Sequence, residues 1–204
     1  MVVRTPRRYE LRKRAQRQAQ TRRRIVDAAL ALHGQVGPAR TTVSAIAGRA
    51  GVQRLTVYRH FPDETALLGA CTNDLFDLHP LPEMNGWFAE RHPPSRLARA
   101  LGDLYAWYRS TDPIVANLLR DAPELPALRE GLRPLTGPLA ELPGALSEGW
   151  PTFGPSGRGR LAGLIGHALD VATWQSLAGR GGLSDREAAA LLVVAARSAA
   201  QDEP

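Results

Sequence analysis

A chain of 204 residues with 44% hydrophobic residues can bury one large core or two smaller ones, which excludes an intrinsically disordered protein. Its single cysteine, Cys71, excludes an intrachain disulfide and a cysteine-based zinc cluster. No uninterrupted apolar stretch approaches the length of about 18 residues that a membrane span needs, and the N-terminus opens with arginines, so we expect a soluble cytoplasmic protein.

Positive charge is concentrated at the N-terminus. In the first 24 residues ten Lys and Arg residues face one carboxylate, Glu10, although the whole chain has 26 basic and 20 acidic residues. Clustered cations release condensed counterions when they bind a polyanion, so a nucleic acid is the expected partner. Residues 1 to about 14 have no sustained apolar period and predict a flexible basic arm, for which a solvated, disordered tail is the alternative interpretation.

Three helices are expected after this arm. The first starts near Ala15, carries one apolar stripe and ends at Gly37 and Pro38. A second short helix, capped by Thr41 or Thr42, ends at Gly51. A third runs from 53 to 60 and buries either Leu55 or Val57 together with Phe61. The expected buried residues of the first two helices are Ile25, Ala28, Ala29, Leu32, Val36, Ile46, Ala47 and Ala50.

The rest of the chain also predicts helices. They cover 63 to about 78, 95–110, 158 to about 178 and 184 to about 199. Residues 113–157 carry many Pro and Gly and predict short or kinked helices without definite limits. No alternation typical of strands appears, so the fold class is all-α: an N-terminal three-helix domain over 1–62 and a larger helical domain over 63–204.

Two short helices joined by a tight turn at Gly51, and braced by an amphipathic first helix, describe a helix-turn-helix. Arginine can pair with guanine and glutamine with adenine, whereas hydroxyl groups suit phosphates. We therefore expect the polar side chains of the second short helix to face DNA, namely Gln53, Arg54, Thr56, Arg59 and His60.

The string TTVSAIAGRAGVQRLTVYRHFPDETALL at 41–68 resembles the DNA-binding signature of the TetR family of transcriptional regulators. The matching residues are Thr42, Ile46, Ala47, Ala50, Gly51, Val52, Thr56, Tyr58, Phe61, Leu67 and Leu68. The resemblance is specific over about 20–70. It is weaker elsewhere, although TWQSLAGRGGLSDREAA at 173–189 is similar to the joint between the last two helices of this family's C-terminal domains.

The resemblance implies a role for each residue that matches. Thr42 and Tyr58 would hold phosphates, and His60 would support a contact with the DNA backbone. Four side chains would face base edges: Ser44, Gln53, Arg54 and Thr56. The family usually has a Lys where this chain has Glu64, and a carboxylate cannot attract a phosphate, so we expect the basic arm to offset that loss.

The C-terminal domain has two candidate sites. A ligand pocket is predicted from Phe76, Tyr105, Trp107, Tyr108, His167 and Trp174, because Gly163, His167, Asp170 and Trp174 would share one helical stripe. The alternative is an ordinary core tryptophan beside a hydrogen-bonded histidine. A dimer seam is predicted from a second, narrower set of residues: Leu161, Leu164, Ala168, Ala172, Leu191, Leu192 and Ala195.

These patterns and the resemblance together predict a repressor that binds an inverted-repeat operator as a homodimer and is released by a small-molecule effector. The histidines show no paired ligand spacing and no nucleophile motif appears, so we expect no metal, no cofactor and no catalytic residue. Two alternatives stay open: a nonspecific nucleoid-type DNA-binding protein, and a helical enzyme with a vestigial helix-turn-helix.

Overall fold

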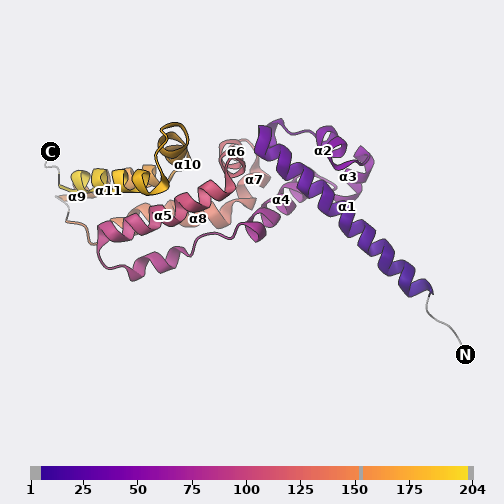
Figure 1. Cartoon of the computed structure of the whole chain (residues 1–204), viewed down its shortest axis with the longest axis horizontal. Helices are drawn as coiled ribbons and strands as arrows, with labels where there is room; N and C mark the ends of the chain where they lie inside the picture. The colour runs from indigo at the N-terminus through magenta and orange to yellow at the C-terminus, as the bar shows by residue number, and fades with distance from the viewer. Residues whose placement is uncertain (1–5, 152–153, 202–204) are drawn as a thin grey trace, which may run out of the picture. The chain divides into compact units, whose positions relative to one another are not determined.

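A computed structural model describes residues 6–151 and 154–201, and all its regular elements in these ranges are helices (Figure 1). This outcome confirms the predicted all-α class. The chain divides into two compact units. The first comprises Met1–Leu78 and Asn117–Gly131, and the second comprises His79–Ala116 and Leu132–Pro204. No helix of the described residues has the length and apolar character needed to cross a membrane.

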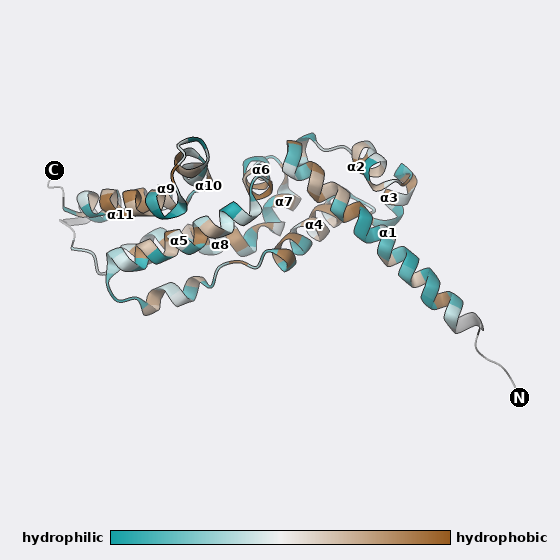
Figure 2. Cartoon of the chain, viewed as in Figure 1, coloured by the Kyte–Doolittle hydropathy of each residue, from teal (hydrophilic) through white to brown (hydrophobic). Residues whose placement is uncertain are grey.

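The first unit begins with one long helix, α1 (Pro6–Val36), and the expected flexible arm is therefore wrong for residues 6–14. Residues 1–5 of that arm lie outside the described residues. From 9 to 20 every residue of α1 is exposed. Because this part of the helix buries no face, its sequence has no apolar stripe from which a helix could be predicted. Figure 2 shows this half of α1 as largely hydrophilic and apolar residues in its second half.

The helix-turn-helix follows as η1 (Pro38–Arg40), α2 (Val43–Ala50) and α3 (Arg54–His60), and α4 (Glu64–Leu78) completes the run. Thr42 caps α2, because its hydroxyl oxygen accepts a hydrogen bond from Ala45 N at 3.2 Å. Gly51 has a φ of 64°, a left-handed conformation that a side chain disfavours, and this ends α2 in a tight turn. Asp63 similarly accepts a hydrogen bond from Ala66 N at 2.7 Å at the start of α4.

The core of this unit lies where α1, α2, α3 and α4 meet. The predicted stripes supply it except near the end of α1, where Leu32 is only half-buried. The prediction is wrong for Val36, which is 37% exposed because it is the last residue of α1. The third helix contributes Val57 rather than Leu55, which is exposed. Burying these aliphatic and aromatic side chains provides most of the free energy that holds three short helices together. Its buried residues include Ile25, Ala29, Ile46, Ala47, Val57, Phe61, Leu67 and Cys71.

Two later elements join the first unit. α7 (Pro126–Gly131) packs on α4, where Gly131 lies so near Thr72 that an added Cβ would come within 2.7 Å of the Thr72 hydroxyl oxygen. The last five residues of α6 (Ile114–Asp121) also belong to this unit, whereas its first three belong to the second. The boundary predicted between residues 62 and 63 separates a DNA-binding domain from a ligand-binding domain. The compact units do not test that functional division, so it stays a prediction.

The second unit is organised around α5 (Pro93–Thr111), which packs against α8, α9, α10 and α11. Its other elements are η2 (Met84–Ala89), α8 (Arg133–Ser147), α9 (Gly154–Leu169), α10 (Val171–Trp174), a π-helical turn η3 (Gln175–Arg180) and α11 (Asp185–Gln201). Trp87 is fully buried and donates its indole N–H to Asp103 at 2.8 Å, which fixes η2 on α5.

The single helix predicted over 158 to about 178 is wrong, because α9 ends at Leu169. Asp170 adopts an extended backbone conformation, and its carboxylate accepts a hydrogen bond from Ala172 N at 2.7 Å. An aspartate that caps a new helix competes with continuation of the old one. The expected stripe through Gly163, His167, Asp170 and Trp174 is therefore not one helical face.

Candidate nucleic-acid interface

The third helix presents a polar face to the outside of the first unit. Gln53 and Arg54 are exposed at its N-terminal end, and Tyr58, one turn later, is 43% exposed. Leu55 is 67% exposed beside them, a position that sequence reasoning treated as a possible core residue. An exposed leucine on such a face offers an apolar surface for a thymine methyl group, whereas Gln53 and Arg54 offer hydrogen bonds to base edges.

The remaining residues expected to contact DNA lie on α2 and α3 as well. Thr42 and Ser44 are exposed at the start of α2, and Thr56 and His60 are half-buried on α3. The Thr42 oxygen accepts the capping bond, so its O–H can still donate to a phosphate oxygen. Nothing in the structure tests the role of any of these residues, and the assignments stay predictions.

A cleft of about 570 Å³ separates α1 from the C-terminal end of α3. Arg22 closes one side of it by donating to His60 O at 3.3 Å and lying over the Phe61 ring at 4.2 Å. The sequence analysis predicted a run of cations but not this cleft. Spacings of three and four residues on one helix would have shown which of the cations share a face. The cleft is lined by Arg14, Arg17, Gln18, Ala19, Thr21, Arg22, Thr56, Arg59 and His60.

The start of α4 is acidic. Asp63 and Glu64 are both exposed, and both line a second cavity of about 260 Å³ inside the first unit. Asp63 caps the helix through Ala66 N, so its negative charge faces the positive end of the helix dipole. The carboxylate of Glu64 would repel a phosphate, which leaves the attraction of DNA to the cations of α1, α2 and α3.

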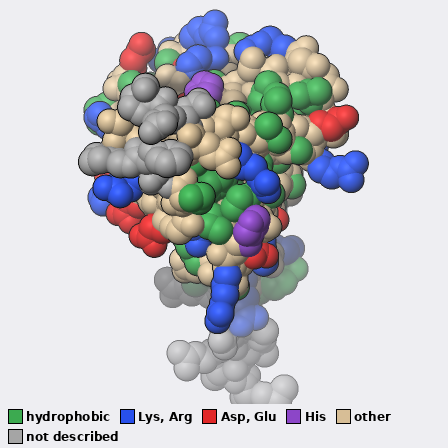
Figure 3. All heavy atoms as spheres, turned by 90° about the vertical axis from the view of Figure 1, so that its left-hand side faces the viewer, with side chains coloured by type: hydrophobic (Ala, Val, Ile, Leu, Met, Phe, Trp, Pro, Cys, Tyr) green, Lys and Arg blue, Asp and Glu red, His purple; other side chains and the backbone are tan. Residues whose placement is uncertain are grey.

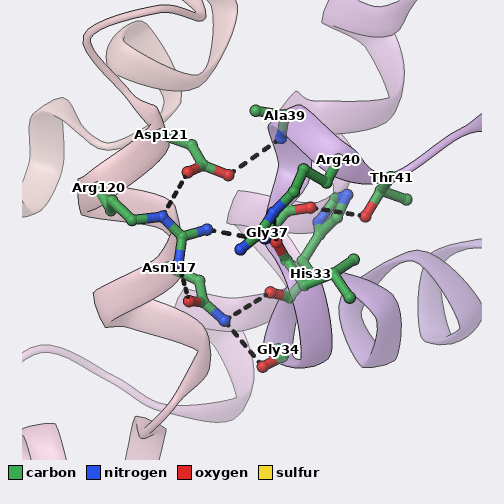
Figure 4. Close-up of polar contacts among 10 residues, drawn as sticks. His33, Gly34, Gly37, Ala39, Arg40, Thr41, Asn117, Arg120 and Asp121 are labelled. Carbon is green, nitrogen blue, oxygen red and sulfur yellow. Dashed lines mark hydrogen bonds and ion pairs between the residues drawn. The ribbon is translucent and has the colours of Figure 1, made fainter.

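A cluster of hydrogen bonds ties the end of α6 to the end of α1 and to the turn before α2 (Figure 4). We call this cluster the polar clip, and it consists of Asn117, Arg120 and Asp121. Asn117 Nδ2 donates to His33 O at 3.1 Å and to Gly34 O at 2.8 Å. Arg120 donates to Val36 O at 3.3 Å, and this carbonyl also accepts from Arg40 Nε at 3.0 Å. Side chains thus supply partners for the Gly34 and Val36 carbonyls at the end of α1, whereas His33 O also accepts from Gly37 N at 3.0 Å.

Asp121 completes the polar clip with its buried carboxylate. One oxygen accepts from Ala39 N at 3.0 Å and the other from Arg120 Nε at 2.8 Å. Burial raises the pKa of the Asp121 carboxyl, but the hydrogen bonds from Arg120 and Ala39 and the charges of Arg120 and Arg40 outweigh it and hold that pKa below its ordinary value. Asp121 is therefore a carboxylate at neutral pH.

His33 lies beside the polar clip and is 2% exposed. Burial lowers its pKa from 6.5 to about 4, and the nearby Asp121 carboxylate opposes that shift only in part. The Nδ1 atom is buried without a hydrogen-bond partner among the described residues. A buried imidazole in this position is neutral at physiological pH, so it packs as a ring and carries no charge.

The residues predicted to form a ligand pocket are divided between the two units. Phe76 is half-buried on α4 in the first unit, whereas the other five belong to the second. Tyr105 and Tyr108 are buried, and their hydroxyls donate to Ala168 O at 2.7 Å and Leu169 O at 2.8 Å. These bonds hold α5 against the end of α9, and burial raises the pKa of both phenols above the ordinary value.

Two tryptophans pack on Tyr108 in the same cluster. Trp107 and Trp174 lie 5.7 Å and 6.0 Å from it between ring centroids. The Trp174 indole N–H donates to Asp185 at 2.8 Å, and Arg109 pairs with the same carboxylate at 2.7 Å. The rings thus pack closely and their polar atoms have protein partners, as the alternative of an ordinary aromatic core expects. The ligand pocket at these residues stays a prediction.

The described surface of the second unit includes two clefts. One, of about 280 Å³, contains the exposed His167, the Thr173 hydroxyl 3.2 Å from its Nε2, and residues of α11. The other, of about 330 Å³, lies between Pro93, Trp150 and the end of α11. Figure 3 shows hydrophobic side chains at the surface of the end of this unit that faces the viewer, close to Lys and Arg side chains.

The residues predicted for the dimer seam fall into two groups. Leu161, Ala168 and Leu192 are buried inside the second unit itself. The others reach the surface of α9, α10 and α11: Leu164 and Ala195 are half-buried, Ala172 is exposed and Leu191 is 50% exposed. Val194, 61% exposed on α11, adds to the apolar surface and was missed, because only its neighbours matched the predicted stripe.

Comparison with known proteins gives a family match for part of the chain. Residues 25–71 match the model of the bacterial regulatory proteins of the tetR family. None of the curated proteins compared with the chain matches it.

Three solved structures share its fold over most of their length. A transcriptional regulator from Rhodococcus sp. Rha1 is 21% identical with a TM-score of 0.58, and 90% of this chain and 99% of that one are covered. The regulator FadR from Bacillus subtilis, in complex with stearoyl-CoA, is 21% identical with a TM-score of 0.52 and coverages of 87% and 97%. The TetR-like regulator LfrR from Mycobacterium smegmatis, in complex with proflavine, is 22% identical with a TM-score of 0.50 and coverages of 89% and 96%.

Proposed function

Because residues 25–71 carry the DNA-binding signature of the tetR family of bacterial regulatory proteins, we propose that this chain represses transcription by binding an inverted-repeat operator and is released by a small-molecule effector. One observation carries the proposal. The side chains of Gln53 and Arg54 are exposed at the start of α3, on a helix whose other face is fixed in the core by Val57. A recognition helix needs this combination of rigid seating and free base-reading groups.

Specific recognition also requires two copies of the chain. One helix of seven residues reads only a few base pairs, so a single copy cannot supply useful specificity. The exposed apolar side chains of Leu191 and Val194 and the half-buried Leu164 support pairing of α9 and α11 with their two-fold mates. A two-fold dimer demands an inverted repeat, with its recognition helices about 34 to 36 Å apart or a multiple of that distance.

Release by an effector needs a route between the units. The solved structures of FadR and LfrR hold stearoyl-CoA and proflavine, which supports a small-molecule ligand for this chain too. α6 is shared between the two units, and its Asn117 and Asp121 hold the end of α1 and the turn before α2. An effector that favours another position of α6 would bind more tightly to the state with weaker DNA affinity. The factor by which DNA lowers the affinity for the effector then equals the factor by which the effector lowers the affinity for DNA.

Selection of bound duplexes from a random-sequence library tests the proposal. We expect the purified chain to enrich one inverted repeat and to bind it at least about a thousandfold more tightly than random duplex at physiological salt. Equal affinity for all duplexes would overturn operator binding and favour a nucleoid-type DNA-binding protein. The groups of the site suit hydrogen bonding to bases and phosphates, and they do not support the alternative of an enzyme.

A further inference from the structure

The first half of α1 has no structural partner in the described part of the chain. Every residue from 9 to 20 is exposed, including Tyr9 and Leu11 at 58% and 61%. A helix of this length without packing is only marginally stable in water. Its cations also repel one another, because Arg17 lies four residues after Lys13 and three after Arg14. A polyanion along this segment would remove that repulsion.

The cations of α1 are sorted between its faces. Arg14, Arg17 and Arg22 line the cleft beside α3, together with Gln18 and Thr21. These five positions follow spacings of three, four, seven and eight residues, so they form one stripe. Among the described residues no carboxylate lines this cleft, and Arg59 and His60 of α3 complete its opposite wall.

Other cations of the same helix point elsewhere. At 100° per residue, Arg12 lies about 160° around the helix from Arg14, and it does not line the cleft. Lys13 does not line it either and lies over the Tyr9 ring, 4.5 Å from its centroid. Arg23 is paired with Asp27 at 3.1 Å. The unneutralised positive charge of the cleft therefore comes from one stripe of α1 and the end of α3.

We propose that this cleft holds the phosphate backbone of DNA that flanks the half-site, so that the operator contact continues outward along α1. The inference rests on the proposed function, because α3 must lie on the duplex for the cleft to meet its backbone. Residues 9 to 22 span about 20 Å at 1.5 Å per residue, which equals the rise of about six base pairs. Phosphate contacts over this length add affinity without sequence information.

The test compares two double variants of the full-length chain. Arg14→Ala with Arg17→Ala removes two cations from the cleft, and Arg12→Ala with Lys13→Ala removes two from outside it. Both pairs are exposed and alanine favours helix, so both variants should fold. Each variant is titrated against two duplexes carrying the selected inverted repeat, one ending at its edges and one with about ten further base pairs on each side.

On the longer duplex, the cleft variant should reduce the slope of log affinity against log salt by about 1.8, or 0.9 for each lost phosphate contact. Raising the salt from about 50 to 200 mM should then weaken the wild type about twelvefold more than this variant. The control variant should keep a slope closer to that of the wild type. On the shorter duplex, the wild type should lose the advantage that the cleft provides, and the two variants should bind alike.

Equal slopes for the two double variants, or a wild-type affinity independent of flank length, would overturn the inference while leaving operator binding intact. If the library yields no preferred sequence, the proposed function fails instead. The slopes of the two variants on a random duplex of about 40 base pairs then still decide whether the cleft binds phosphates.

Discussion

The carboxylate of Asp121 accepts a hydrogen bond from the backbone N–H of Ala39, 82 positions earlier in the chain, at 3.0 Å. The same carboxylate pairs with Arg120 at 2.8 Å. Since the contacts hold the pKa of Asp121 below its ordinary value, the stability they contribute is present above the unfolded-state pKa and is lost as the pH falls through the folded-state pKa.

Asp121→Asn should therefore lower the free energy of unfolding by about 1–3 kcal/mol at pH 7, because a buried charge-assisted contact is lost and Arg120 and Ala39 N compete for one remaining oxygen. Urea denaturation measures this change. Asp77→Asn, on the exposed surface of α4, is the matched control and should change stability little. Equal effects of the two substitutions would show that the polar clip does not stabilise the fold.

His33 should make stability depend on pH in the mildly acidic range. Its pKa is about 4 in the folded chain and 6.5 when unfolded, so between these values the unfolded state binds the additional proton. The free energy of unfolding should fall by about 1.4 kcal/mol per pH unit from pH 6.5 to 4 and receive no further change from this group below that.

Denaturation curves of wild type and His33→Gln across this range check the dependence on His33. The variant should lose most of the slope, whereas His92→Gln, at an exposed histidine, should retain it. A wild-type slope that survives in His33→Gln would assign the effect to another group.

Arg54→Ala should relax the sequence preference of one position in each half-site. The loss of a bidentate contact with a guanine costs about 1–3 kcal/mol on the operator and much less on random DNA. Competition binding with the selected duplex and its single-base variants measures the difference. Equal losses on operator and random duplexes would mean that Arg54 touches only phosphate.

Tyr58→Phe should weaken binding to operator and random duplexes by the same factor, because a hydroxyl that contacts a phosphate carries no base information. The sequence selected from a random library should stay the same. A changed consensus would contradict the phosphate role and place Tyr58 against a base.

Leu191→Glu should convert the dimer into monomers that no longer bind the full operator, because a charge buried in the seam would have no partner. Sedimentation at micromolar concentration measures the assembly. Ala98→Glu adds the same charge at an exposed position of α5 and should leave the dimer intact. A monomeric wild type, or a monomeric variant that still protects both half-sites, would disprove the seam.

Local signals in the sequence predicted the elements around the candidate interface. The Thr42 cap, the Gly51 turn and the apolar spacing of Ile46 and Val57 act within a few residues, so α2, α3 and α4 appear where expected. The choice between Leu55 and Val57 could not be made, because either would fit a short helix. Only packing in the core shared with α1, α2 and α4 buries Val57 and leaves Leu55 exposed.

The wrong predictions have physical causes that do not appear in the apolar periodicity of the sequence. The first half of α1 is helical without an apolar face, so the absence of apolar periodicity led to the prediction of a flexible arm. Asp170 ends α9 by capping the next helix, a signal that the surrounding helix-forming residues obscured. The polar clip joins residues more than 80 positions apart, and nothing in a single sequence pairs Asn117 with Gly34.

The split of the first unit between two stretches of the chain sets an order of events during synthesis. The helix-turn-helix leaves the ribosome with α1, and Arg40 can then already donate to Val36 O. Asn117, which donates to Gly34 O, and Asp121, which accepts from Ala39 N, follow only with α6, and α7 ends at Gly131. A nascent chain that stops at residue 78 therefore has its recognition helix but not the residues that hold α1, η1 and α4 from the other side. Complete assembly of the DNA-binding unit follows translation of the first part of the second unit, so the chain gains its finished DNA-binding surface after it has begun to make the part that would respond to a ligand.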